Sequence, residues 1–220
     1  MAVNKDRIRA SAHKHLQKGN LPKAIREYER LIAGDPNDVR SLLKIGDLQQ
    51  RQGHNELACD AYSQVAQTYS KQGFFLKAAA VLKQILSINP QLLAINLKLA
   101  SIYEKLELGP DARRQYLNAA MLYAERGDWH NRITILEKLV QLEPTDVPTV
   151  KALAECYIAS GNTQRAYEVL EVGATGLRAQ LQDQQYLKLA TPMLRLRPRD
   201  EALLYDVAET HLRLGAPRNA

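Results

Sequence analysis

The stretch VRSLLKIGDLQQRQGHNELACDAYSQVAQTYSKQGFFLKAAAVLKQILSINPQL, residues 39–92, is followed without a gap by two stretches of the same pattern. Residues 93–146 and 147–200 align with it position by position, so the sequence repeats every 54 residues. The matching positions are Ala58, Ala112 and Ala166; Ala66, Ala120 and Ala174; Pro90, Pro144 and Pro198; Tyr62 and Tyr116; Tyr69 and Tyr123; and Gly73 and Gly127. Such a period indicates a stack of units that bury their apolar faces against one another.

Within each repeat the apolar residues follow a helical spacing, as Ile95, Leu99, Ile102 and Leu106 do. No segment alternates as a strand does, and glycine and proline interrupt the pattern at regular places. We therefore expect twelve helices, at about residues 5–18, 22–33, 39–52, 56–72, 75–88, 92–106, 110–126, 129–142, 147–160, 163–181, 184–196 and 201–214.

Short turns make neighbouring helices antiparallel, so each repeat holds three of them. The sequence predicts an all-α fold, a right-handed α-solenoid that forms a single domain over residues 1–220. Its modules are 39–92, 93–146 and 147–200, with partial modules at 1–38 and 201–220. Because the last module stops inside its second helix, we expect the chain to be a piece of a longer protein.

The repeats resemble the tetratricopeptide repeat (TPR) family. In residues 5–38 the similarity lies in Gly19, Ala24, Tyr28 and the run Asp35-Pro36-Asn37-Asp38. Later copies carry Leu42, Ile45, Gly46, Gly53, Ala58 and Tyr62; Leu99, Ala100, Tyr103, Ala112 and Tyr116; and Leu153, Ala154, Tyr157, Gly161 and Ala166. The resemblance implies a non-catalytic adaptor whose concave groove holds a peptide or helix of a partner protein.

Two departures from the family pattern bear on function. A plain array repeats every 34 residues, whereas here a third helix is inserted, and the helix expected at 56–72 also reads as a first helix. The family's subtype that binds chaperone C-termini has lysine at position 5 and asparagine at position 9 of the first helix. The corresponding pairs here are Arg9 and His13, Leu43 and Asp47, Leu97 and Ser101, and Lys151 and Glu155. We therefore expect no chaperone-tail binding.

The formal net charge is +6, and it is unevenly distributed. Residues 1–90 contain 14 Lys and Arg against 8 Asp and Glu, whereas residues 91–220 contain 16 of each kind. We predict a basic partner-binding track that takes an acidic segment of another protein, formed by Arg9, Lys14, Arg40, Lys44, Arg51, Lys98 and Lys105. The alternative is that these side chains form only a solvated helix face.

Two other binding functions remain open at this stage. The basic N-terminal part could contact nucleic acid, although acidic residues interrupt it and no exposed aromatic set accompanies it. The chain could also self-associate into a homo-oligomer through an open C-terminal face formed by Leu204, Val207, Ala208, Leu212 and Leu214.

Catalytic, metal and membrane functions find no support in the sequence. It contains no phosphate-binding loop, GxSxG, HExxH or CxxC motif, so we expect no enzyme activity and no cofactor. The five histidines are scattered, which argues against a metal site. Cys59 and Cys156 are expected to be reduced thiols. The apolar runs are too short to span a bilayer and the start lacks a signal-peptide pattern, so we expect no membrane insertion and a cytoplasmic location.

Overall fold

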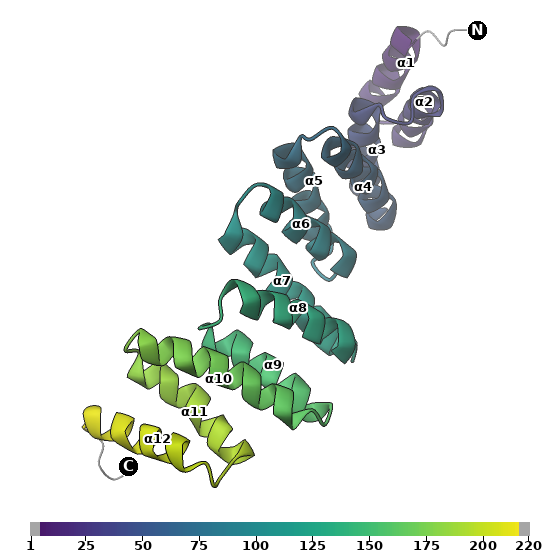
Figure 1. Cartoon of the computed structure of the whole chain (residues 1–220). Coiled ribbons are helices and arrows are strands. Elements are labelled where there is room, and N and C mark those ends of the chain that lie inside the picture. The colour runs from purple at the N-terminus through teal and green to yellow at the C-terminus, as the bar shows by residue number, and fades with distance from the viewer. Residues whose placement is uncertain (1–4, 216–220) are drawn as a thin grey trace. The chain divides into compact units, whose positions relative to one another are not determined.

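The computed structural model describes residues 5–215, and within this range the chain forms twelve α-helices and no strand (Figure 1). The helices are α1 (Lys5–Gln17), α2 (Leu21–Gly34), α3 (Val39–Arg51), α4 (Asn55–Lys71), α5 (Phe75–Ile88), α6 (Leu93–Lys105), α7 (Gly109–Glu125), α8 (Trp129–Leu142), α9 (Val147–Ala159), α10 (Thr163–Ala179), α11 (Asp183–Leu196) and α12 (Glu201–Arg213). Every expected helix is confirmed, with ends shifted by at most two residues. The helices α3, α6, α9 and α12 begin 54 residues apart, as the repeat predicts.

Side-chain caps fix where many of these helices begin. The side chains of Asp38, Asp146 and Asp200 each accept a hydrogen bond from the backbone N–H three residues later, at the starts of α3, α9 and α12. Leu92 stands at the same place before α6 and offers no such bond. Because a cap satisfies a backbone donor that the helix leaves free, these aspartates define the start of the leading helix in three modules.

The turns after the helices require a left-handed backbone residue. Gly53 and Gly161 fill this role after the leading helices, with φ of 78° and 79°. The corresponding position after α6 is Glu107, with φ of 58°, and Leu181 has φ of 55° where other modules have glycine. A side chain at positive φ costs energy that glycine avoids, so these two turns are strained relative to their counterparts.

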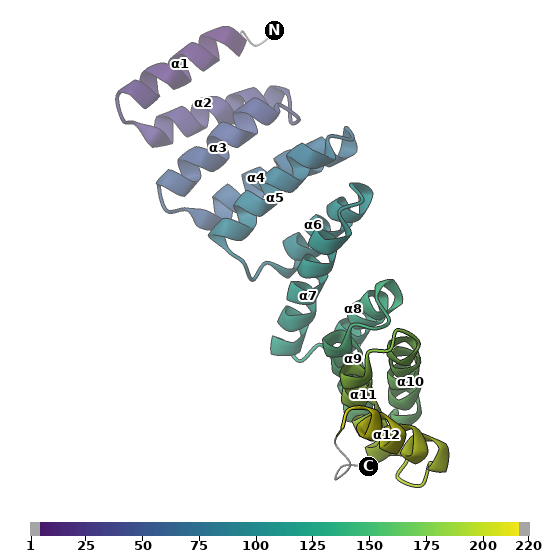
Figure 2. The same ribbon diagram turned by 90° about the vertical axis from the view of Figure 1, so that its left-hand side faces the viewer.

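The described contacts divide the chain into two compact units, Met1–Gln115 and Tyr116–Ala220. In unit 1 each helix from α1 to α5 packs against the next one in the chain (Figure 2). Its core is rich in alanine, and Ala12, Ala24, Ala58 and Ala78 are fully buried. Small side chains let the helix axes approach closely, and Tyr62 fills the space between α3 and α4.

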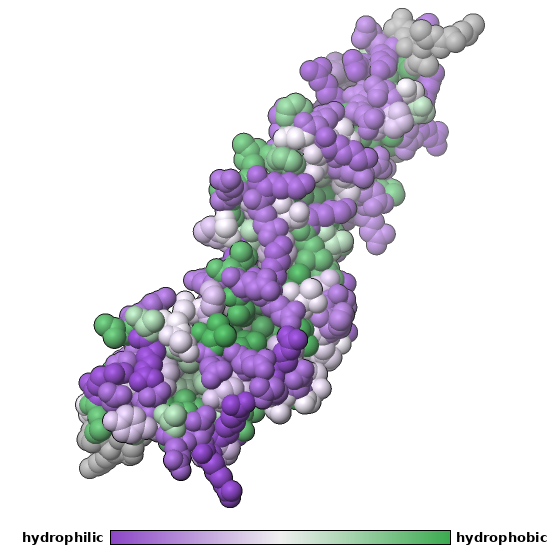
Figure 3. Space-filling view, in the orientation of Figure 1, coloured by the Kyte–Doolittle hydropathy of each residue, from purple (hydrophilic) through white to green (hydrophobic). Residues whose placement is uncertain are grey.

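Unit 2 is built in the same way. The helix α10 packs against both α9 and α11, and α9 also contacts α11 directly. Its buried residues include Val150, Leu153, Leu170 and Leu189. Gly173 is required here because a Cβ would lie 2.9 Å from the carbonyl oxygen of Pro144. The visible face of each unit is mainly hydrophilic, with hydrophobic residues in small patches between helices (Figure 3).

The repeated tyrosines divide between core and edge. Tyr62 is fully buried and Tyr116 is 5% exposed, so both belong to the core. Tyr69 is half-buried and meets the ring of Phe74 edge-on, with 6.3 Å between the centroids. Burial, together with a hydrogen bond to Asp47, raises the pKa of Tyr62 well above its usual value. Its phenol therefore stays neutral and acts as a donor to that carboxylate.

None of the described helices combines the length and apolar character that crossing a membrane requires.

Candidate binding groove

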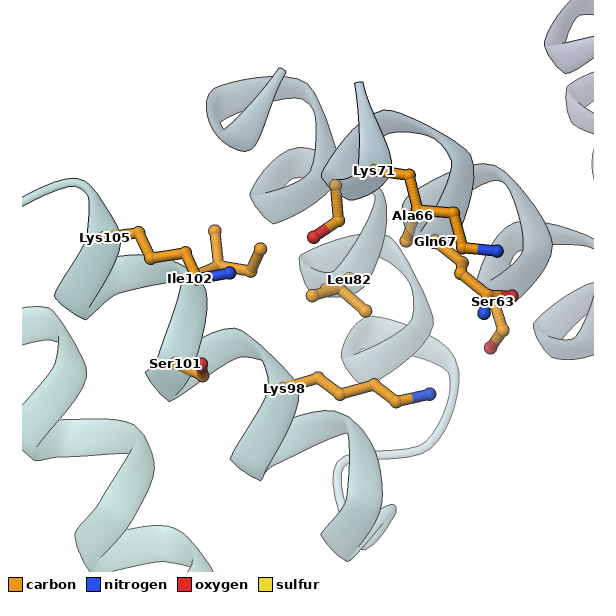
Figure 4. A pocket seen from close by; sticks show the side chains of 10 residues that line it. Ser63, Ala66, Gln67, Lys71, Leu82, Lys98, Ser101, Ile102 and Lys105 are labelled. Carbon is orange, nitrogen blue, oxygen red and sulfur yellow. The ribbon is translucent and has the colours of Figure 1, made fainter. Parts of the chain in front are cut away.

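A cavity of about 240 Å³ lies in unit 1 between α4 and α6, with α5 at its base (Figure 4). We call it the α4–α6 groove. From α4 it is lined by Ser63, Ala66, Gln67, Ser70 and Lys71, from α5 by Leu82, and from α6 by Lys98, Ser101, Ile102 and Lys105.

The spacing of the lining residues explains why they share this groove. On α6 they fall at i, i+3, i+4 and i+7, counted from Lys98, which is one face of a helix. The lining residues of α4 are also three or four positions apart. The buried Leu82 and Ile102 belong to the core and form an apolar floor below the polar side chains.

The groove is cationic and its charges are uncompensated. Its lining contains Lys71, Lys98 and Lys105 and no carboxylate. None of these lysines forms an ion pair with a carboxylate among the described residues. The Lys105 ammonium lies 5.0 Å above the centroid of the Phe75 ring, a cation–π contact that holds it at one end of the groove.

The structure brings together only part of the predicted basic track. All seven of its residues are exposed, but only Lys98 and Lys105 line the groove. Arg9 donates to Asp38 at 3.3 Å, and the Lys44 ammonium lies 3.9 Å from the Asp47 carboxylate. The remaining members, Lys14, Arg40 and Arg51, are exposed on α1 and α3 outside the lining.

The sequence analysis missed Lys71. It ends α4, the helix whose assignment as first or second helix of a repeat was ambiguous. A lysine at the C-terminus of a helix is also expected from the helix dipole alone, so nothing marked it as a binding residue. The helical spacing could have indicated Lys71 as a lining residue, since it lies four residues after Gln67 and therefore on the same face of α4.

The equivalent cavity in unit 2 has a different charge pattern. It lies between α10 and α12, and Asp206 stands there where the repeat has Lys98 in unit 1. Arg178 forms ion pairs with Asp206 and with Glu209, the latter at 3.7 Å. Arg213, equivalent to Lys105, pairs with Asp183 at 2.9 Å. Both arginines are therefore paired with carboxylates, while the lysines of the α4–α6 groove form no ion pair among the described residues.

The C-terminal face predicted for self-association is smaller than expected. On α12, Leu204 and Leu212 are 45% and 58% exposed, and Leu214 just beyond its end is 40% exposed. Val207, however, is buried and belongs to the core, because it lies on the side of α12 that packs on the unit. Ala208 is half-buried. The exposed apolar part of this face therefore excludes Val207.

Other reactive groups do not assemble into a site. Cys59 is half-buried and Cys156 is buried, both as free thiols. Burial raises the pKa of the Cys156 thiol, which keeps it protonated and unreactive. Among residues 5–215 no group of three or more His, Cys, Asp or Glu side chains is placed to hold a metal ion. The lining of the α4–α6 groove contains no His, Cys, Asp or Glu that could act as a base.

Comparison with known families places the fold. Models of tetratricopeptide repeats match residues 40–71, 60–92 and 123–191, and a TPR repeat model matches residues 12–53. Together these matches cover more than half of the chain. A comparison with curated protein sequences found no match.

Several solved structures are similar at low identity. A tetratricopeptide repeat protein from Parabacteroides merdae is 17% identical, with 94% of this chain and 98% of that chain covered and a TM-score of 0.28. PilW, a type IV pilus biogenesis factor, is 16% identical over 96% of this chain and 92% of its own, with a TM-score of 0.36. The Rap conjugation gene regulator of plasmid pLS20, solved with the Phr* peptide, is 15% identical over 96% and 63%, with a TM-score of 0.41. Scores this low add nothing to the sequence matches.

Repeating antiparallel helices, each packed on its neighbours within its unit, define the class: the protein is an all-α solenoid. The matched repeats identify the family, and the chain is a tetratricopeptide repeat protein. Repeats of this family are typically non-catalytic and serve as scaffolds for protein–protein interaction, which is the general function of this chain.

Proposed function

We propose that the chain is a non-catalytic adaptor that binds an acidic segment of a partner protein in the α4–α6 groove. The observation that carries this proposal is the set of three lysines without ion pairs, Lys71, Lys98 and Lys105, around a floor of Leu82 and Ile102. A cytoplasmic location, where such an adaptor would meet its partner, remains a prediction.

Charge and apolar contact have different roles in this groove. The lysines attract carboxylates over a distance of about 10 Å, so they accelerate encounter and select against basic segments. An apolar side chain that reaches Leu82 and Ile102 loses contact with water and slows dissociation. The preferred ligand therefore combines carboxylates with at least one apolar anchor.

Two further residues of the predicted basic track are included in this proposal. By the 54-residue repeat, Lys44 and Arg51 on α3 are equivalent to Lys98 and Lys105 on α6. We propose that these two residues contact the same acidic segment beyond the groove. Arg9 contributes less because it is held by Asp38, and Lys14 and Arg40 remain predicted contacts.

Selection from a random peptide library on the immobilised 220-residue chain tests this proposal. We expect enriched peptides to combine Asp or Glu with a Leu, Ile or Phe. Lys98→Glu with Lys105→Glu should reduce their affinity on the order of tenfold, because two attractive charges become repulsive. Lys83→Glu is the matched control, since Lys83 is exposed on α5 outside the lining.

Two outcomes would count against the proposal. Enrichment of peptides without acidic residues would contradict the proposed role of the lysines in selecting an acidic ligand. Stronger binding to random oligonucleotides than to the selected peptides, with a steep loss on adding salt, would instead favour the nucleic-acid function.

A further inference from the structure

Unit 2 contains a second groove, formed by helices that the α4–α6 site does not use. Two cavities of about 560 and 530 Å³ lie along α9 and α11. Both are lined by Lys151, Glu155 and Lys188, so they adjoin and form one continuous trough. We call it the α9–α11 groove. The two helices contact each other, and both pack against α10 (Figure 1).

The lining follows one face of each helix over most of its length. From α9 it comprises Val147, Pro148, Lys151, Ala152, Glu155 and Ile158, and from α11 Gln185, Leu187, Lys188, Thr191, Pro192, Arg195 and Leu196. At a rise of about 1.5 Å per residue, the lined part of α9 is roughly 17 Å long. An extended peptide of about five or six residues would fill that length.

The charges in this groove are also uncompensated. Lys151, Lys188 and Arg195 carry three positive charges, and Glu155 is the single carboxylate in the lining. None of the four forms an ion pair within the described residues. The α10–α12 cavity of the same unit differs, because its arginine Arg178 is paired within the chain.

Apolar surface accompanies these charges. Ile158 is 42% exposed, and it lines the groove together with Leu187 and Leu196. Isolated exposed apolar side chains are ordinary on protein surfaces. Here the apolar residues lie together in a trough flanked by cations, which is the arrangement that an amphipathic segment requires.

A proline interrupts the hydrogen bonding of α11 beside this groove. Pro192 stands inside α11 and has no N–H to donate to the carbonyl of Lys188, four residues earlier. The Thr191 hydroxyl bonds instead to the Leu187 carbonyl at 2.8 Å. Pro192 therefore leaves the carbonyl of Lys188, a residue that lines the groove, without its usual partner in the helix.

We propose that the α9–α11 groove is a second docking site, which binds an acidic partner segment carrying apolar side chains. The excess of three cations over one carboxylate sets the sign of the ligand's charge, and the exposed Ile158 with Leu187 and Leu196 supplies the apolar contact. The site does not depend on the α4–α6 groove, since the two share no residue. An adaptor with both sites holds two acidic segments, or two parts of one partner.

Fluorescence anisotropy of the 220-residue chain tests the site with two defined probes. One is a labelled eight-residue peptide of alternating glutamate and leucine, and the other replaces each leucine with serine. Lys188→Glu should weaken the leucine probe about tenfold at low salt, and Glu155→Gln should strengthen it about threefold by removing the one repulsive charge. Ile158→Ser should weaken the leucine probe and leave the serine probe unchanged.

Arg199→Glu is the matched control, because Arg199 is exposed in the turn before α12 and outside the lining. Each titration is repeated in a chain that carries Lys98→Glu and Lys105→Glu, so that binding in the α4–α6 groove cannot account for the result. Circular dichroism verifies that each variant is folded. Should Lys188→Glu not fold, Glu155→Gln and Ile158→Ser still test the site.

Persistence of the Lys188 and Glu155 effects in the Lys98 and Lys105 background supports the second site. Equal weakening by Lys188→Glu and Arg199→Glu would overturn it, because that result indicates non-specific attraction. Complete loss of probe binding in the Lys98 and Lys105 variant, with Lys188→Glu silent on its own, would overturn it as well. Neither result would contradict the proposed function of the α4–α6 groove.

Discussion

Gly46 on α3 lies so close to Tyr62 on α4 that a Cβ at position 46 would meet three ring carbons at 2.5, 2.8 and 2.9 Å. The Tyr62 hydroxyl passes α3 and donates to Asp47 at 2.8 Å. The tyrosine is fully buried, so its ring cannot move aside without opening the interface between the two helices. Glycine at position 46 is therefore a packing requirement of this tyrosine.

Gly46→Ala should destabilise the chain by about 1–3 kcal/mol, the usual cost of overpacking a buried interface. The repeat suggests the compensating change, because alanine and leucine occupy the equivalent positions Ala154 and Leu170 in unit 2. We expect Tyr62→Leu to cost less in the Gly46→Ala background than in the wild type. Urea denaturation of the four chains measures this coupling, and strict additivity would contradict it.

Asp38 should make stability depend on pH in the acid range. Burial acts to raise its pKa, but hydrogen bonds from the Ser41 side chain and backbone, and the charge of Arg9, outweigh burial and hold the pKa below its usual value. A carboxyl with a lowered pKa contributes stability above its unfolded pKa and loses it as the pH falls through the folded value. The wild type should therefore lose this contribution below about pH 4.

Two variants separate the charge of Asp38 from its role as a helix cap. Asp38→Ala removes the cap of α3 and should cost about 1–2 kcal/mol at pH 7. Asp38→Asn keeps a capping oxygen and cannot titrate, so its stability should fall less between pH 5 and pH 3 than that of the wild type. Identical pH profiles for the Asn variant and the wild type would contradict the assignment to Asp38.

Glycine should stabilise the two turns that carry a side chain at positive φ. Glu107 and Leu181 have φ of 58° and 55°, and Leu181 is 83% exposed, so its side chain contributes little burial. Leu181→Gly and Glu107→Gly should each raise stability by about 0.5–1 kcal/mol, because relief of strain exceeds the added entropy of the unfolded chain. Thermal unfolding measures the effect, with Lys83→Gly, at an exposed position inside α5, as the destabilising control.

The sequence predicts the helices well because their period and caps are local. The starts of α3, α9 and α12 follow from Asp38, Asp146 and Asp200. The remaining helices recur with the same 54-residue spacing. The candidate sites are different, because they depend on which helix faces which. The two family matches at 40–71 and 60–92 use α4 in different positions of the repeat, so the pattern alone does not decide which face of α4 is available.

The sequence also does not show which charged side chains form ion pairs. Arg9 and Lys98 look alike as exposed basic residues, yet Arg9 bonds to Asp38 from another helix, while Lys98 has no carboxylate partner. The sequence also gave no indication of the α9–α11 groove. The second part of the chain has no net charge excess, and its cations Lys151 and Lys188 stand out only when packing brings them together with Arg195 around a single carboxylate, Glu155.

The α10–α12 cavity offers a direct test of the idea that unpaired lysines make a groove bind acidic segments. The repeat equates Arg178, Asp206 and Glu209 with Ser70, Lys98 and Ser101 of the α4–α6 groove. Arg178→Ser, Asp206→Lys and Glu209→Ser together remove the ion pairs of Arg178 and place the unit 1 residue at each of these three positions.

The triple variant is measured in a chain that also carries Lys98→Glu and Lys105→Glu, so that the α4–α6 groove does not contribute. Its affinity for the acidic peptides selected on the wild type should increase on the order of tenfold at low salt. The gain should decrease as salt is added, because the new attraction is electrostatic and exposed. Arg178→Ser alone is the control, since it leaves the Asp206 carboxylate without its ion pair, and that charge repels the peptide. If the triple variant is folded by circular dichroism and shows no gain, then free cations at these positions are not sufficient, and the shape of the α4–α6 groove must determine its binding.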